Sequence, residues 1–259
     1  MKIMKFGGTS VGKPERMHQV YELITKDTES KIVVLSALSG TTNALVDISN
    51  SLSAGNKAEA KQKIDTLEAH YHAFVLDLLK TEVLIAKGNA IVKEHFEFLN
   101  IITKISFSDA LNKDILAQGE LMSTKLFCCY LEQQGQDHLL LPALDFMVLD
   151  QNEEPSLPLI RSKLNTLLAA HADKKIFITQ GYICKNVRGE VDNLKRGGSD
   201  YTASLVAAAC KASVCEIWTD IDGMHNNDPR IVNKTVAIEQ LSFDEAAELA
   251  YFGAKILHP

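Results

Sequence analysis

The sequence lacks the features that mark membrane and secreted proteins. Its 259 residues contain no apolar run of about 18 residues, the length that a membrane-spanning helix needs. The amino terminus enters a strand-like segment, KIMKF, without the apolar core of a signal peptide. We therefore expect no membrane partner.

Cysteine is scarce and irregularly placed. The five cysteines are odd in number, and no two of them are spaced as Cys-x-x-Cys. Disulfide frameworks use even numbers and structural zinc sites use closely paired cysteines, so neither is indicated. We expect reduced thiols, no metal site built by the protein, and a cytoplasmic location.

An excess of basic residues is also missing. Lys and Arg number 27 against 33 Asp and Glu, which leaves a formal net charge of −6. A nucleic-acid surface needs a basic patch or stripe, so no nucleic-acid partner is expected. An anionic ligand would need a local group of cations and backbone amides, because the whole-molecule field does not attract it.

The sequence does contain alternating strand-like and helix-like segments. Residues 2–6 and 31–37 predict buried strands, and apolar residues at helical spacing between them predict a crossover helix starting near Pro14. The order strand, helix, strand is typical of a parallel sheet. We expect a three-layer α/β/α fold with a mainly parallel central sheet.

Later segments extend this pattern. Helical spacing predicts a helical insertion over about 44–113, and then a helix over 114–134 that is interrupted early by Gly119. The remaining predicted elements are strands at 139–144, 175–183 and 214–220, a hairpin turning at Arg188-Gly189, a helix capped by Ser199, and a helix opened by a capping box of Ser242 and Glu245.

The stretch GGTSVGKP, from Gly7 to Pro14, nearly matches a P-loop. That motif places Ser or Thr after the lysine, and the hydroxyl holds Mg²⁺. Pro14 stands there instead and offers neither a hydroxyl nor an amide hydrogen. A P-loop is therefore disfavoured.

A second interpretation uses the residues before the proline. Lys5 lies near the end of the predicted strand, and a glycine pair lets the backbone amides approach a ligand. With the positive end of the following helix, these residues would form an anion cradle: Lys5, Gly7, Gly8, Thr9 and Ser10. The alternative is a tight turn in which glycine serves geometry alone. This stretch by itself does not decide between them.

A second glycine pair occurs in LKRGGSDYTA, from Leu194 to Ala203. It also enters a predicted helix, and Arg196, Ser199 and Asp200 surround it. Two such helix entries would let two anionic groups approach each other, as phosphoryl transfer between anions requires.

Seven segments occur in one order: KFGGTSVG, VVLSALSGTTN, QGE, RGGSDYTA, IWTDIDG, NDPR and FGAKILHP. Together they resemble the aspartate kinases of the amino acid kinase family, over residues 2–259. The resemblance implies transfer of the γ-phosphoryl group of ATP, with Mg²⁺, to the β-carboxylate of L-aspartate, giving 4-phospho-L-aspartate at the start of lysine, threonine and methionine biosynthesis. A carboxylate is already ionised at pH 7, so no general base is needed.

The resemblance also implies roles for individual residues. Lys5 would stabilise the charge on the transferred phosphoryl group, and Asp200 would orient Lys5. The glycine-rich cradle would lie against the phosphates. Aspartate would contact Ser36, Thr42, Glu120, Arg196, Gly197, Gly198 and Ser199, with Arg196 on its α-carboxylate and Glu120 on its ammonium. The nucleotide would contact Thr219, Asp220, His225, Arg230 and Lys255.

Three positions depart from the family pattern. His225 stands where many members have Tyr, Lys195 where Gly is common, and Tyr182 where Phe is frequent. The first puts one adenine-side contact in doubt. The second adds a positive charge beside the substrate loop, and the third is a mild change.

The resemblance further implies a lobe of about 1–183 for aspartate and a lobe of about 184–259 for the nucleotide. Family members continue beyond the position of Pro259, add regulatory ACT domains, and in some cases are fused to homoserine dehydrogenase. We therefore expect part of a longer, homo-oligomeric protein. We expect this part to lack ACT domains and feedback inhibition by lysine or threonine.

Two other hypotheses stay open. Another kinase of this fold could act on glutamate, acetylglutamate or carbamate, although Glu120 with Arg196 favours a free α-amino acid. A sensor could bind nucleotide or aspartate without catalysis, although the presence of both Lys5 and Asp200 favours an enzyme.

Overall fold

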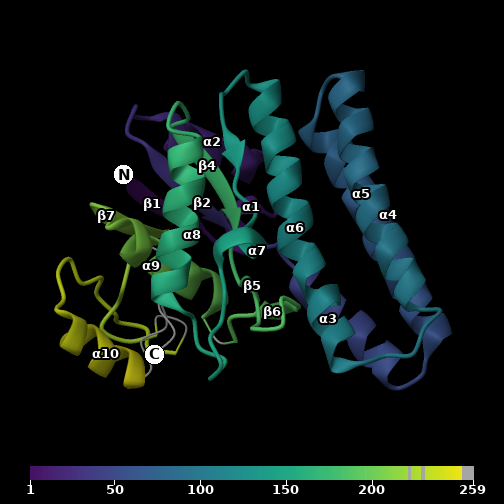
Figure 1. Cartoon of the computed structure of the whole chain (residues 1–259). Coiled ribbons are helices and arrows are strands. Elements are labelled where there is room, and N and C mark those ends of the chain that lie inside the picture. The colour runs from purple at the N-terminus through teal and green to yellow at the C-terminus, as the bar shows by residue number, and fades with distance from the viewer. Residues whose placement is uncertain (196, 221–222, 229–230, 253–259) are drawn as a thin grey trace.

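The computed structural model describes residues 1–195, 197–220, 223–228 and 231–252. Within these residues, five parallel strands form a central sheet in the order β3-β4-β2-β1-β7 (Figure 1). The strands are β1 (Lys2–Phe6), β2 (Lys31–Leu35), β3 (Leu139–Leu140), β4 (Ile176–Gln180) and β7 (Val214–Trp218).

Each face of the sheet contacts its own apolar core, because successive side chains of a strand point to opposite faces. On β1, Met4 and Phe6 contact the first core, whereas Ile3 contacts the second. The first core is closed by α2 (Pro14–Thr25), α3 (Thr41–Ser53), α4 (Lys57–Leu78), α5 (Glu82–Ile102) and α6 (Asp109–Gln133). The second is closed by α7 (Ala143–Phe146), α8 (Leu157–Ala170) and α9 (Gly198–Cys210). The predicted three-layer α/β/α fold is confirmed.

The segment after β1 is a single helical turn followed by a longer helix. The turn is α1 (Gly8–Val11), and α2 starts at Pro14 with Lys13 as its N-cap residue. Lys13 is exposed and has an extended backbone, so it precedes the helix. In a P-loop the lysine lies inside the first helical turn, so this geometry supports the rejection of that motif.

Helices fill the region that was predicted to be a helical insertion. The α4–α5 hairpin packs beyond α6 when viewed from the sheet (Figure 1). The hydroxyl groups of Tyr71 on α4 and Thr41 at the start of α3 are hydrogen-bonded at 2.9 Å. The hairpin therefore supports the segment that follows β2. The insertion and the lobe boundary near residue 183 stay predictions.

Helix α6 runs through Gly119 without a break, so the predicted interruption there is wrong. A Cβ atom on Gly119 would lie 2.8 Å from the Cβ of Ala37 and 3.3 Å from the Cγ2 of Thr41. This glycine therefore lets α6 cross closely over the segment after β2.

Two predicted strands are shorter than expected. Only Leu139 and Leu140 of the segment 139–144 pair as a strand, and Pro142 then leads into α7. The segment 175–183 is divided into β4 and β5 (Ile183–Lys185). The division occurs because Tyr182 has a left-handed backbone with φ 67°, which turns the chain.

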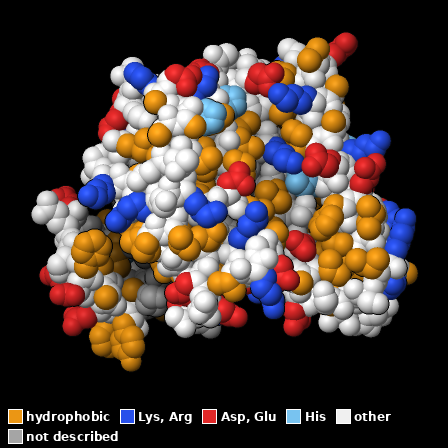
Figure 2. Space-filling model, viewed as in Figure 1, with side chains coloured by type: hydrophobic (Ala, Val, Ile, Leu, Met, Phe, Trp, Pro, Cys, Tyr) orange, Lys and Arg blue, Asp and Glu red, His pale blue; other side chains and the backbone are white. Residues whose placement is uncertain are grey.

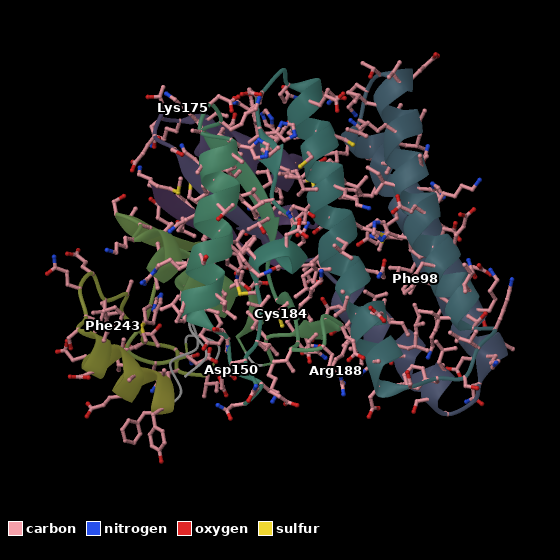
Figure 3. The ribbon with its side chains drawn as sticks, viewed as in Figure 1. Phe98, Asp150, Lys175, Cys184, Arg188 and Phe243 are labelled. Atoms are coloured by element: carbon pink, nitrogen blue, oxygen red, sulfur yellow. The ribbon has the colours of Figure 1, made fainter. Side chains whose placement is uncertain are left out.

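The predicted hairpin and capping box are confirmed. Strands β5 and β6 (Val191–Asn193) are antiparallel, and Gly189 in their turn has φ 79°. Helix α10 (Phe243–Tyr251) begins with the reciprocal bonds of Ser242 and Glu245. In Figure 3, Phe243 of α10 lies at the outer end of the molecule, where it is 97% exposed.

The predicted cap of α9 is wrong. The helix begins at Gly198, and its N-cap residue is Gly197 with φ 72°, a left-handed conformation that glycine adopts easily. Ser199 lies inside the first turn, where its hydroxyl meets a different partner, described below.

Charged side chains of both signs are interspersed over the face seen in Figure 2. No helix of the described residues is long and apolar enough to cross a membrane.

We expect Gly119→Ala to lower the free energy of unfolding by roughly 1–3 kcal/mol, because the added methyl group overlaps Ala37 in a packed crossing. In an open helical position, the same change would raise it by about 0.5–1 kcal/mol. Urea denaturation of both proteins measures the difference. Unchanged or increased stability would contradict the close crossing.

Candidate active site

A cleft of about 490 Å³ lies where the strands of the sheet reach their carboxyl ends. Open α/β sheets usually bind ligands at this edge. Its described lining residues are Gly8, Thr9, Ser36, Ala37, Leu38, Ser39, Gly40, Thr42, Glu120, Tyr182, Lys195, Gly198 and Ser199. Most of the residues predicted to contact aspartate are therefore brought together, although they come from distant parts of the chain.

An ion pair joins the two glycine-bearing segments beside this cleft. The Nζ atom of Lys5 lies 2.7 Å from Oδ1 of Asp200, and the two side chains are 12% and 24% exposed. Lys5 is next to last in β1, and Asp200 is in the first turn of α9. A Cβ atom on Gly7 would lie 3.4 Å from the same ammonium, which therefore lies against the first glycine pair.

Hydroxyl and glycine contacts hold the start of α9 against the sheet. The hydroxyl of Ser36, after β2, donates to Oγ of Ser199 at 2.9 Å. A Cβ atom on Gly181, after β4, would overlap Ser199, and one on Gly198 would overlap the ring of Tyr182. The chain can bring these segments so close only because glycine occupies both positions.

Tyr182 is a site residue that the sequence indicated only as a departure from a family pattern. Its left-handed backbone is held because its N–H donates to Oγ1 of Thr202 at 2.9 Å and its carbonyl accepts from the N–H of Leu194 at 2.7 Å. Such a conformation costs a non-glycine residue about 1–2 kcal/mol. Burial raises the pKa of Tyr182 to about 12, so its phenol stays neutral.

Glu120 is a buried carboxyl group in the cleft wall. Its side chain is 3% exposed, and Oε1 accepts from the N–H of Ala37 at 3.3 Å. Oε2 has no hydrogen-bond partner among the described residues. Burial raises the pKa of Glu120 to about 8, against the opposing effect of the Ala37 bond. A ligand ammonium would supply the missing partner and favour the ionised form.

Packing explains why position 8 is a glycine. A Cβ atom there would lie 2.9 Å from the carbonyl oxygen of Ala37. Packing alone therefore requires glycine at this position, as in the tight-turn alternative. Gly7 has φ −76°, which any residue adopts, and it faces the Lys5 ammonium. Of the two neighbouring glycines, Gly8 therefore packs against the backbone, whereas Gly7 lies against the Lys5 ammonium.

A second cavity of about 220 Å³ adjoins the ends of β1 and β7. Thr9 borders both cavities, so α1 separates them. Trp218 stacks on Phe6 with ring centroids 5.9 Å apart, which places it in the packed wall. The described lining residues predicted to contact phosphate or nucleotide are Thr9, Ser10, Thr219 and Asp220.

The sequence also predicted His225, Arg196, Arg230 and Lys255 as site residues. His225 is hydrogen-bonded through Nδ1 to the hydroxyl of Thr235 at 2.9 Å. Arg196, Arg230 and Lys255 lie outside the described residues. Among the residues whose positions are described, no group of three or more His, Cys, Asp or Glu side chains could hold a metal ion.

The family model described as the amino acid kinase family matches residues 1–259. The chain belongs to the amino acid kinase family. Lysine-sensitive aspartokinase 3 of Escherichia coli is 34% identical over 260 residues, which cover 99% of this chain and 57% of the relative. Aspartokinase of Chlamydia trachomatis is 35% identical over 259 residues, with 99% and 57% covered. The chain thus spans little more than half the length of these relatives.

Bifunctional enzymes are also similar. The bifunctional aspartokinase/homoserine dehydrogenase of Haemophilus influenzae is 34% identical over 275 residues, which cover 100% of this chain and 33% of the relative. Among solved structures, E. coli aspartokinase III in complex with aspartate and ADP matches with a TM-score of 0.87 and 33% identity. That match covers 100% of this chain and 58% of the other. The aspartate kinase resemblance seen in the sequence is confirmed.

We expect the chain to lose stability relative to Glu120→Gln as the pH rises from about 4.5 to about 8. In this window the unfolded carboxyl group ionises, whereas the buried one keeps its proton. The unfolded state then binds fewer protons, so the free energy of unfolding falls with pH. Glutamine does not titrate, and the difference between the two proteins isolates this group.

Thermal unfolding midpoints of both proteins, recorded without ligand across this pH range, measure the effect. A constant difference between the two curves would contradict a buried carboxyl group with a raised pKa.

Proposed function

We propose that this chain holds the catalytic site of an aspartate kinase, which transfers the γ-phosphoryl group of MgATP to the β-carboxylate of L-aspartate. The observation that supports it most is the ion pair of Lys5 and Asp200, which joins two glycine-bearing segments at the edge of the cleft. Family membership and the names of the relatives also support it.

The main obstacle in this reaction is repulsion between a carboxylate and a polyphosphate. Catalysis then depends on alignment and on cations placed where negative charge develops. Lys5 supplies the ammonium for the transferred phosphoryl group. Asp200 holds that ammonium in place from α9, whose amino-terminal end adds a positive dipole. The nucleophile is ionised at neutral pH, so the site needs no base to activate it.

Different residues of the cleft wall bind the ammonium group and the carboxylates of the amino acid. Glu120 receives the ammonium group through its unpartnered Oε2 atom. The hydroxyl groups of Ser199 and the exposed Thr42 donate to carboxylate oxygens, and Ser36 contacts the same ligand while its hydroxyl donates to that of Ser199. Gly197 and Gly198 bring backbone amides to the same wall. Arg196 binds the α-carboxylate through its paired N–H groups.

The nucleotide occupies the side of β7. Thr219 and Asp220 bind its sugar or base, and Thr9 and Ser10, in the wall between the cavities, meet its phosphates together with Gly7 and Gly8. His225, Arg230 and Lys255 complete this part. Mg²⁺ arrives with ATP, and the described residues offer no separate carboxylate cage. This fits an ion held mainly by phosphate oxygens and water.

The proposed setting is a cytoplasmic biosynthetic enzyme that is homo-oligomeric in its longer form. The relatives that include homoserine dehydrogenase suggest one such longer form.

An assay with Mg²⁺, ATP and L-aspartate tests the proposal, with the acyl phosphate trapped by hydroxylamine. Glutamate, N-acetylglutamate and carbamate are offered in parallel, because a kinase for one of these acids is the leading alternative. Preference for any of them over aspartate would reject the aspartate assignment. Calorimetric binding of aspartate and ATP without any turnover would favour a sensor.

We expect Lys5→Ala to lower kcat for aspartate by at least about a hundredfold, the scale of losing one major electrostatic group. Lys2→Ala is the matched control, because Lys2 lies on the same strand but pairs with Asp27 and Glu29 at its opposite end. It should keep a near-normal kcat. A near-normal kcat for Lys5→Ala as well would remove Lys5 from the mechanism.

A further inference from the structure

The acidic and basic side chains of the cleft wall are few and lie at opposite depths. Of the described lining residues, only Glu120 and Lys195 are acidic or basic. Glu120 is buried, whereas the Lys195 side chain is 76% exposed and borders the opening. A ligand with an ammonium group at one end and a carboxylate at the other complements this arrangement.

The backbone around Lys195 is anchored, whereas its side chain is exposed. The N–H of Leu194 donates to the carbonyl of Tyr182 at 2.7 Å, and Gly197 begins the cap of α9 two residues later. The backbone of Lys195 therefore has a fixed position on the cleft wall. Its four-carbon stem lets the ammonium move over several ångströms.

Lys195 pairs with a carboxylate outside the cleft. Its Nζ atom lies 3.4 Å from Oε2 of Glu153, whose side chain is 70% exposed. Glu153 sits in a turn that Asp150 closes, because Oδ1 of Asp150 accepts from the N–H groups of Asn152 and Glu154. In Figure 3, the labelled Asp150 lies at the opposite end of the molecule from Lys175, which precedes β4. This turn therefore lies near the edge that holds the cleft.

Such an exposed pair is easily exchanged. Ion pairs in contact with solvent contribute little to stability, because water screens both charges. A ligand carboxylate entering the cleft can replace Glu153 at small cost. The turn around Asp150 then holds the released glutamate outside the cleft.

We propose that Lys195 is a specificity-determining cation of the amino acid site, which leaves Glu153 and pairs with a carboxylate of the bound α-amino dicarboxylate. This inference rests on the proposed function. At neutral pH such a substrate bears two carboxylates and one ammonium. Its net negative charge is attracted by a lysine at the opening of the cleft. Lys195 acts on binding and not on the reacting phosphoryl group, so it changes KM for the amino acid and leaves kcat unchanged.

The test compares Lys195→Met with the wild-type chain in steady-state kinetics. We expect the aspartate KM to rise by roughly threefold to tenfold, the effect of losing one charged contact. We expect kcat and the ATP KM to stay within about twofold. The matched control is Lys93→Met, which breaks a similarly exposed pair with Glu97 on α5, 72% and 63% exposed. It should leave all three constants unchanged.

Two further measurements separate exchange from a local structural role. Glu153→Gln should lower the aspartate KM by about twofold in the wild-type background and have no effect beside Lys195→Met, because the glutamate acts only by competing for the lysine. The defect of Lys195→Met should also shrink at about 0.5 M salt, since screening removes the attraction in both proteins.

An unchanged aspartate KM in Lys195→Met, in a chain whose wild type phosphorylates aspartate, would overturn this inference alone. An effect of Glu153→Gln that persists without Lys195 would also overturn it. If the wild-type chain neither binds aspartate in calorimetry nor phosphorylates it, the proposed function fails, and the inference fails with it.

Discussion

The ion pair of Lys5 and Asp200 depends on where the sheet places its first strand. In the register, Lys5 lies between Val34 of β2 and Ile217 of β7, so its backbone is held on both sides. Its side chain follows that of Ile3 on the face that α9 covers. An ammonium in this position needs a carboxylate because it is largely removed from water. Asp200 meets that need and brings the amino-terminal end of α9 to the end of β1.

The rest of the cleft is arranged by close backbone contacts that only glycine permits. Ala37, after β2, is approached by Gly8 from one side and by Gly119 of α6 from the other. Gly198 packs in the same way against Tyr182. Interiors are too densely packed to absorb an added methyl group without a shift. The positions of the serine hydroxyls and of the Glu120 carboxyl group follow from these contacts.

Two features of the same cleft lower the stability of the fold. Glu120 is buried with one oxygen unpartnered, and Tyr182 has a left-handed backbone. Both cost free energy, and surrounding packing must offset that cost. A ligand ammonium beside Oε2 of Glu120 would relieve the first cost. The exposed pair of Lys195 and Glu153, in contrast, changes stability little, because water screens both charges and the pair is easily exchanged.

The sequence by itself determined the layers of the fold, the helix start at Pro14 and the capping box of Ser242. These features depend on local patterns: side-chain periodicity, proline geometry and short-range hydrogen bonds. The segments from which the cleft is built were indicated by the resemblance of their motifs to those of a known family. Only the tertiary structure decided that α6 passes unbroken over Ala37, that Gly197 caps α9, and that Tyr182 turns the chain between β4 and β5. The physical reason is that each of these depends on contacts with residues distant in sequence, which local propensity does not encode.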